Sequence, residues 1–209
     1  MNNVQEAYNA WSSIYDANKN RTRDLEAVSL RETVADLKVN SCLEIGCGTG
    51  KNSVYLSSKV QKLSAVDFSE NMLAKARQKL TDHQIEFIKA DITGNWDFLS
   101  QTYDLITFSL VLEHIEHLND VLLKAANALR KGGFVYIGEL HPFKQYTGTK
   151  ARFETSKGVE EVTCFNHHVS DFTEAATQAG LQLVSIKEYF DENDRSALPR
   201  ILTLLLSKQ

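Results

Sequence analysis

Residues 43–50 read Leu43-Glu44-Ile45-Gly46-Cys47-Gly48-Thr49-Gly50, a short apolar run that leads directly into a glycine-rich turn. Three alternating glycines are typical of backbone that takes positive φ angles or lies close against another group. In open α/β sheets, a turn of this kind at the carboxyl end of a parallel strand is where nucleotide-like ligands bind. The stretch therefore predicts a buried strand, a ligand-binding turn and the start of a helix.

The composition is that of an ordinary globular chain. Its 209 residues are 43% hydrophobic and 24% charged, which suits one substantial core, so we expect a single domain over residues 1–209. No apolar run approaches the ~18 residues of a membrane-spanning helix, and residues 1–10 lack the apolar centre of a secretory signal. The formal net charge of -4, without a basic block, makes a nucleic-acid partner unlikely.

The three cysteines favour a reducing compartment. Cys42, Cys47 and Cys164 are odd in number, and two of them lie in or beside the predicted buried strand. Such cysteines behave as small buried hydrophobic residues, and their spacing does not suit a zinc site. We therefore expect a cytoplasmic protein, with its oligomeric state left open.

The rest of the chain predicts helices and strands in alternation. Apolar residues at steps of three and four predict one helix over residues 3–16 and a second over residues 24–37. Apolar strands then alternate with helices, which is typical of βαβ units around a parallel sheet. The expected strands cover residues 41–45, 63–66, 85–90, 103–108 and 134–139, and the expected helices cover residues 50–58, 69–80 and 118–130.

The alternation ends at His141-Pro142, because proline removes a donor from the ladder of a strand. Residues 143–167 are expected to form a hairpin or an extended loop over the sheet. A helix that begins at Asp171 then precedes two final strands, over residues 181–189 and 201–206. No helix separates these two strands, so they are expected to pair antiparallel.

Acidic residues stand at the ends of the predicted strands. Glu44 precedes the glycine turn, Asp67 ends the second strand 21 positions after Gly46, and Asp91 ends the third strand. An acid at the position of Asp67 suits hydrogen bonds from both hydroxyls of a ribose. Each acid alone is more simply explained as a helix cap or turn former, but three of them beside a glycine turn favour a ligand site.

The glycine spacing distinguishes two classes of ligand. A dinucleotide fingerprint runs Gly-x-Gly-x-x-Gly, so that the pyrophosphate meets the N-terminus of the helix. Here the spacing is Gly-x-Gly-x-Gly, with Lys51 where the late glycine would fall. Glu44 beside the turn would repel a pyrophosphate and would favour a cation.

Residues 43–50 resemble the first motif of class I S-adenosylmethionine-dependent methyltransferases. Asp67 matches the ribose-binding acid of that family, and Asp91-Ile92 matches its adenine-contacting loop. The resemblance covers residues 35–209. It is closest to the small-molecule branch, which includes the methyltransferases of the ubiquinone, menaquinone and biotin pathways.

The resemblance implies an α/β fold with a single Rossmann-like, doubly wound sheet, mostly parallel with one antiparallel strand near the C-terminus. Residues 1–37 would form an N-terminal helical cap, and residues 141–168 an insertion after the fifth strand, on the substrate side. The implied cofactor is S-adenosylmethionine, with S-adenosylhomocysteine as product and in-line transfer of the methyl group to a small-molecule acceptor. The implied cofactor-binding residues are Glu44, Gly46, Gly48, Gly50, Asp67, Phe68, Asp91, Ile92 and Tyr15.

The acceptor side of the site has its own candidates. His114 follows the expected fourth strand and His141 leaves the fifth, so we expect these two as catalytic residues, although either could only brace its loop. Some quinone-pathway relatives hold a metal with Glu-x-x-Glu-His here, but Leu110 stands at the first position, so no metal is expected. The candidate substrate-binding residues are Tyr8, Trp11, Arg152 and His168.

Other functions stay open from the residues alone: an RNA or protein methyltransferase, a nicotinamide-dependent oxidoreductase, and a non-catalytic cofactor-binding protein. The acidic balance counts against RNA, and the glycine spacing counts against a nicotinamide dinucleotide. A complete set of site glycines and acids indicates cofactor binding but not catalysis. The acceptor atom stays open among oxygen, nitrogen, sulfur and carbon.

Overall fold

A seven-stranded sheet, in the order β3-β2-β1-β4-β5-β9-β8, forms the centre of this computed structural model. The structure describes residues 2–12, 15–17, 19–82, 84–149, 152–155 and 158–209, with only the backbone of residues 2–3, 152–155 and 158–160. The strands of this sheet are β1 (Ser41–Ile45), β2 (Lys62–Asp67), β3 (Ile85–Lys89), β4 (Tyr103–Ser109), β5 (Leu129–Leu140), β8 (Leu181–Tyr189) and β9 (Ile201–Lys208).

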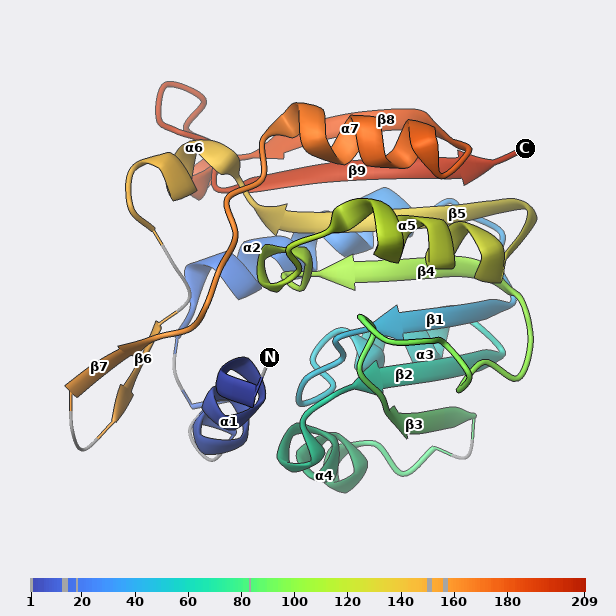
Figure 1. The fold of residues 1–209 in the computed structure, drawn as a ribbon, viewed down its shortest axis with the longest axis horizontal. Helices are drawn as coiled ribbons and strands as arrows, with labels where there is room; N and C mark the ends of the chain where they lie inside the picture. Colours follow the sequence, from blue (N-terminus) through green and yellow to red (C-terminus); the bar gives the residue numbers. More distant parts are fainter. Residues whose placement is uncertain (1, 13–14, 18, 83, 150–151, 156–157) are drawn as a thin grey trace.

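The strand directions confirm the expected fold class. Strands β1 to β5 pair in parallel, whereas β9 is inserted between β5 and β8 and pairs antiparallel with both. The carboxyl ends of the parallel strands therefore share one edge of the sheet, at the left of Figure 1. The order of strands reverses between β1 and β4, and open α/β sheets bind ligands outside the carboxyl ends of such strands.

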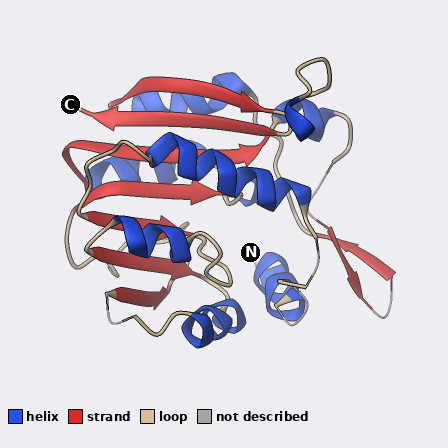
Figure 2. Ribbon diagram, turned by 180° about the vertical axis from the view of Figure 1, so that it is seen from behind, coloured by secondary structure: helices blue, strands red, loops and turns tan. Residues whose placement is uncertain are grey.

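Helices cover both faces of the sheet, as Figures 1 and 2 show from opposite sides. On one face, α2 (Arg21–Val34), α3 (Ser53–Lys59) and α4 (Glu70–Lys79) pack their apolar side chains into one core. On the other face, α5 (Leu118–Ala128) and α7 (Val169–Gln178) pack into a second, larger core. None of the helices in the described part of the chain is long and apolar enough to cross a membrane.

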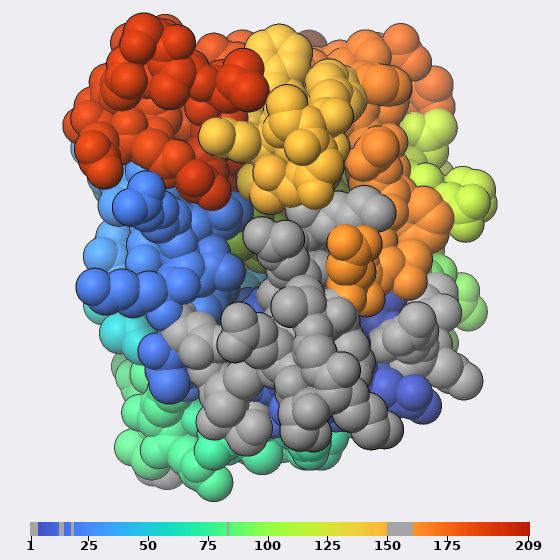
Figure 3. Space-filling model, turned by 90° about the vertical axis from the view of Figure 1, so that its left-hand side faces the viewer, coloured from blue at the N-terminus to red at the C-terminus, as the bar shows by residue number. Residues whose placement is uncertain are grey.

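Three small elements lie at the carboxyl edge of the sheet. They are α1 (Asn2–Trp11), α6 (Pro142–Tyr146) and the antiparallel hairpin of β6 (Arg152–Thr155) and β7 (Gly158–Glu161). Figure 3 looks onto this edge, where the described residues that follow β7 lie beside α6. Of the two alternatives expected for residues 143–167, a hairpin or an extended loop, the structure has a hairpin, which forms a separate two-stranded sheet.

The N-terminal helices differ from their expected boundaries. Helix α1 ends at Trp11, so Tyr15 lies in a turn and not in the helix expected over residues 3–16. Helix α2 begins at Arg21 because the Asn20 side chain accepts a hydrogen bond of 3.0 Å from the N–H of Arg23. Capping of this kind satisfies a donor that the first turn of a helix leaves free.

Helices α6 and α7 also begin where the sequence did not predict them. Residues 142–146 form a helix instead of a loop, because proline is tolerated in a first turn and His141 Nδ1 accepts the N–H of Phe143 at 3.2 Å. Helix α7 is capped at His168, whose N–H donates to Asp171 at 2.7 Å. Asp171 therefore lies in the first turn of α7 and does not precede it.

Candidate active site

A cavity opens at the carboxyl ends of β1 to β4, beneath α1. Its empty space, with the open solvent at the mouth included, is about 730 Å³. The predicted site residues that line it are Gly46, Gly48, Asp67, Phe68, Asp91, Ile92, Tyr15, Tyr8 and His114. The lining residues that the sequence did not single out include Val4, Thr93, Ser109, Leu110, Val111 and Ile115.

The glycines of the turn serve different purposes. At Gly46 the φ angle is +71°, and a Cβ would lie 2.2 Å from a methyl group of Val111, so only glycine lets the loop after β4 approach. At Gly48 the φ angle is +53° and no protein atom lies within 4 Å of a Cβ, so this position leaves the cavity open. Gly50 instead faces Ala76 and does not line the cavity.

Asp67 connects the turn to the next helix and faces the cavity. One carboxylate oxygen accepts the N–H of Gly48 at 2.8 Å, and the other accepts the N–H of Ser69 at 2.9 Å. Burial raises the pKa of Asp67 to about 6, despite these hydrogen bonds, so the carboxylate is ionised at pH 7. Each oxygen keeps a lone pair, so Asp67 can accept hydrogen bonds from the two hydroxyls of a ribose.

Glu44 lies beneath the glycine turn and is not part of the cavity lining. Its side chain is 3% exposed and accepts a hydrogen bond of 2.5 Å from Ser53 Oγ. Burial raises the pKa of Glu44 to about 8, so the carboxyl group is mostly protonated at pH 7. The negative charge at the cavity therefore comes from Asp67 and Asp91, not from Glu44 as the sequence suggested.

The loop after β3 forms a second part of the same wall. Asp91 accepts hydrogen bonds from the N–H and the hydroxyl of Thr93 at 2.9 and 2.7 Å, and so closes a tight turn. Ile92 is 9% exposed and presents an apolar surface beside it. The described lining contains two carboxylates and no Lys or Arg, which suits a cationic ligand such as a sulfonium.

Aromatic side chains cover the cavity from the N-terminal residues. Tyr15 reaches the lining from its turn, where the Arg23 guanidinium lies 4.0 Å from the ring centroid and donates to the Tyr15 carbonyl at 2.8 Å. Tyr8 lies on α1, with its ring centroid 6.1 Å from that of Phe68. Trp11 is buried in the same group but does not line the cavity.

Leu110 is a strained residue in the cavity wall. Its φ angle is 56°, a left-handed conformation that costs a residue other than glycine about 1–3 kcal/mol. The N–H of Leu110 donates to the carbonyl of Gly138 at 2.8 Å, which holds the chain in this conformation as it leaves β4. Strain of this kind concentrates at functional sites. No feature of the sequence predicts it at Leu110.

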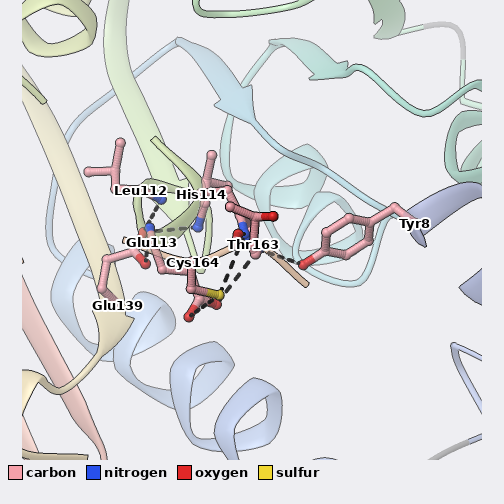
Figure 4. A network of polar contacts seen from close by, with 8 residues as sticks. Tyr8, Leu112, Glu113, His114, Glu139, Thr163 and Cys164 are labelled. Atoms are coloured by element: carbon pink, nitrogen blue, oxygen red, sulfur yellow. Dashed lines mark hydrogen bonds and ion pairs between the residues drawn. The ribbon is translucent and has the colours of Figure 1, made fainter. Parts of the chain in front are cut away.

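Tyr8 and His114 form a second wall of the cavity and belong to a group of polar residues that we call the Tyr8–His114 cluster: Tyr8, Glu113, His114, Thr163 and Cys164 (Figure 4). His114 is central, because its Nε2 lies 2.9 Å from the Tyr8 hydroxyl and its Nδ1 lies 2.8 Å from the Thr163 carbonyl oxygen. The Cys164 thiol lies 3.9 Å from Glu113 and 3.8 Å from His114. In the described part of the chain, no three His, Cys, Asp or Glu side chains are grouped so as to hold a metal ion.

Glu139 fixes the short helix η1 (Leu112–His114) that carries His114. One oxygen of its buried carboxyl group accepts the N–H groups of Val111 and Leu112 at 2.9 and 2.8 Å. Burial raises the pKa of Glu139 to about 8 and also raises that of Glu113. A residue on β5 therefore determines where the histidine after β4 stands.

The structure places the remaining predicted residues outside the cavity lining. His141 is 1% exposed, and its Nε2 lies 3.0 Å from a Glu188 oxygen on β8 while its Nδ1 caps α6. His168 is exposed, with its Nδ1 2.5 Å from the Tyr146 hydroxyl. The side chain of Arg152 lies outside the described residues.

Comparison with known proteins finds methyltransferases. A family model described as a methyltransferase domain matches residues 43–137. An uncharacterized methyltransferase of Emericella nidulans is 23% identical, over 97% of this chain and 84% of that protein. The demethylmenaquinone methyltransferase of Lactococcus lactis is 32% identical over 66% of this chain, which spans only 59% of that relative.

Solved structures of low sequence identity share the fold. An S-adenosylmethionine-dependent methyltransferase from Clostridium acetobutylicum superposes with a TM-score of 0.72 at 17% identity, over 97% of this chain and 99% of that one. The N-methyltransferase NodS from Bradyrhizobium japonicum, in complex with S-adenosylhomocysteine, gives 0.73 at 18% identity, over 99% and 98%. The methyltransferase domain model thus covers the glycine turn and the strand-end acids, and these solved structures show that the chain has the fold of S-adenosylmethionine-dependent methyltransferases.

Proposed function

We propose that this chain transfers the methyl group of S-adenosylmethionine to a small-molecule acceptor that enters the cavity beside Tyr8 and His114. The observation that carries the proposal is one cavity with two unlike walls, a ribose-binding carboxylate on one side and a hydrogen-bonded histidine on the other. Bound S-adenosylmethionine would supply an electrophilic methyl group on a cationic sulfur. Asp67 would hold the ribose, and Asp91 and Ile92 would flank the adenine.

The protein's own contribution is alignment and removal of water. Methyl transfer is an in-line displacement, so much of its barrier can be lowered by holding acceptor and methyl group in register. The aromatic side chains of Tyr8, Tyr15 and Phe68 cover the cavity and exclude water from it. If the acceptor carries an ionisable proton, His114 is the base nearest to it.

The choice of a small molecule rests on charge and on relatives. No basic side chain stands in the described lining, which disfavours the phosphate backbone of a nucleic acid. Relatives of this chain are named for demethylmenaquinone and for malonyl-[acyl-carrier protein]. We extend the proposal to one domain over residues 1–209, with residues 141–168 on the substrate side, in the cytoplasm, where three free cysteines would stay reduced.

A calorimetric titration followed by a metabolite screen tests the proposal. We expect heat from S-adenosylmethionine and none from a nicotinamide dinucleotide, and then release of S-adenosylhomocysteine that depends on a small metabolite. Binding of the nicotinamide dinucleotide alone would instead establish an oxidoreductase. Labelling of RNA or protein, with no small metabolite accepted, would replace the substrate class and leave the cofactor assignment in place.

A further inference from the structure

Two hydrogen bonds fix where His114 carries its proton. Its Nδ1 lies 2.8 Å from the carbonyl oxygen of Thr163, which can only accept, so Nδ1 must donate. A neutral imidazole has one N–H, so Nε2 is then an acceptor and takes the hydrogen of the Tyr8 hydroxyl at 2.9 Å. The neutral form of the histidine is therefore held in a single tautomer, with its basic nitrogen pointing at a phenol.

The same geometry covers the basic nitrogen of His114. The His114 side chain is 10% exposed, and its Nε2 is occupied by Tyr8 (Figure 4). The Tyr8 oxygen uses its hydrogen on His114, but its lone pairs remain free to accept from a molecule in the cavity that Tyr8 lines. An acceptor in this cavity can therefore donate to the phenol oxygen, whereas His114 Nε2 is already paired with Tyr8.

We propose that Tyr8 is the catalytic residue that touches the acceptor, and that it relays the acceptor's proton to His114. This rests on the proposed function. The bond between the acceptor heteroatom and its hydrogen breaks as an O–H bond forms on Tyr8, while the original Tyr8 O–H breaks as an N–H forms on His114 Nε2. The electron pair stays on the acceptor heteroatom, which becomes the nucleophile.

The residues around Tyr8 and His114 favour the relay at both the phenol and the imidazole. Burial raises the pKa of Tyr8 well above its ordinary value, so the phenol does not ionise on its own. It gives its hydrogen to His114 only as it takes the acceptor's hydrogen. The imidazolium that forms keeps the Thr163 carbonyl on Nδ1 and has a Glu113 oxygen 3.9 Å from Nε2. The titratable groups that face Tyr8 are His114, Tyr15, Glu113, Cys164 and Asp67.

Thr163 acts as a positioning residue through its backbone. Its carbonyl selects the tautomer, and two residues later the N–H of Phe165 donates to the Glu113 carbonyl at 2.7 Å. These bonds attach the segment after β7 to η1 at Glu113 and at His114. The segment between the hairpin and α7 therefore determines which nitrogen of the histidine can act as a base.

A second tyrosine–histidine pair provides an internal control. The Tyr146 hydroxyl lies 2.5 Å from His168 Nδ1, but this pair is exposed and does not line the cavity. Substitution Tyr146→Phe removes the same hydroxyl from the same kind of partner. It should alter His168 and leave His114 as it is.

Nitrogen-15 NMR of the histidine side chains tests the tautomer in the full chain with S-adenosylhomocysteine bound. We expect His114, assigned by the loss of its signals in His114→Gln, as the neutral form protonated at Nδ1. Tyr8→Phe should shift the His114 Nε2 signal, and Tyr146→Phe should shift only His168. Protonation of His114 at Nε2, or signals that Tyr8→Phe leaves unmoved, would overturn the relay whatever the enzyme's substrate.

Kinetics with an acceptor from the metabolite screen tests the proton transfer itself. We expect Tyr8→Phe to lower kcat by about 10²–10⁴-fold, to change the pH profile of kcat, and to leave affinity for S-adenosylhomocysteine unchanged. A rise in KM with an unchanged kcat and pH profile would mean that Tyr8 only positions the acceptor, and would overturn the relay. Failure of the wild-type chain to bind S-adenosylmethionine would refute the proposed function, a separate result.

Discussion

The two walls of the cavity are built in different ways. The strand wall, which we define as Gly46, Gly48, Asp67, Asp91 and Ile92, consists of residues at the ends of β1 to β3 or just after them. The Tyr8–His114 cluster instead joins segments that are distant in the chain, with hydrogen bonds across 106 and 49 positions. Sheet topology dictates the first wall, whereas only tertiary packing brings the second together.

This difference implies different consequences of substitution. Residues of the strand wall are tied into the sheet and the turn beside it, so changes there should affect folding and cofactor affinity. Helix α1 is tied to α4 and the loop before it by a few hydrogen bonds, such as that of 2.6 Å from Ser69 Oγ to Asn9 Oδ1. Changes there should affect local opening and turnover more than global stability.

Gly46→Ala should have the largest effect. Its Cβ would meet Val111 at 2.2 Å, and the φ angle of +71° adds strain, so the free energy of unfolding should fall by about 2–5 kcal/mol. Gly132→Ala is the matched control, because its φ angle is +78° but nothing lies within 4 Å of its Cβ. Urea denaturation should give only about 1–2 kcal/mol for the control, and equal losses would contradict the clash.

Asp67→Asn should weaken cofactor binding by about 10–100-fold, because an amide replaces a charged acceptor of ribose hydroxyls. Asp104→Asn is the control, since Asp104 also accepts two backbone N–H groups, of Asn40 and Ser41, but at the opposite end of the sheet. Calorimetry with S-adenosylhomocysteine should show the loss only for Asp67→Asn. Unchanged affinity in that variant would remove Asp67 from the site.

Glu44→Gln should change how stability depends on pH. The pKa of Glu44 is raised to about 8 in the folded chain, so between about pH 4.3 and pH 8 only the unfolded chain gives up this proton. The group therefore lowers wild-type stability as pH rises, by up to about 1.4 kcal/mol per pH unit. Denaturation at pH 5 and pH 8 should show a flatter slope for Glu44→Gln. The exposed control Glu192→Gln should keep the wild-type slope.

Asn9→Ala should have the smallest effect on global stability, below about 1 kcal/mol, because it removes one partly buried hydrogen bond. The amides of α1 should nevertheless exchange with solvent faster, while those of β1 and β4 keep their protection. Hydrogen exchange followed by mass spectrometry measures both regions at once. Faster exchange in β1 as well would mean that α1 and the sheet unfold together.

The strand wall could be predicted from the sequence for a topological reason. An apolar run followed by a glycine or an acid marks the carboxyl end of a strand, and parallel strands bring these ends together. The sequence also predicted that residues 181–189 and 201–206 pair antiparallel, because no helix separates them, and the family resemblance implied one antiparallel strand near the C-terminus. Gly50 and Glu44 share the same motif but contact α4 and Ser53, since a pattern along the chain does not say which way a side chain points.

For the Tyr8–His114 cluster, the sequence predicted single residues but not the contacts between them. His114 and Tyr8 were candidates, but their hydrogen bond depends on how α1 docks, and that has no periodic signal. Leucine disfavours positive φ, so the left-handed conformation of Leu110 could not be predicted from the sequence. His141 was expected at the cleft, whereas its ring bonds to Glu188, a contact that forms only when β8 returns to the sheet edge.

The crystal structure of the complex with S-adenosylhomocysteine tests the central claim most directly. We expect ribose hydroxyl oxygens at hydrogen-bond distance, about 2.6–3.2 Å, from the Asp67 carboxylate, with the adenine against Ile92 and the sulfur on the side of Tyr8 and His114. A ligand bound elsewhere, or a ribose that does not contact Asp67, would contradict it.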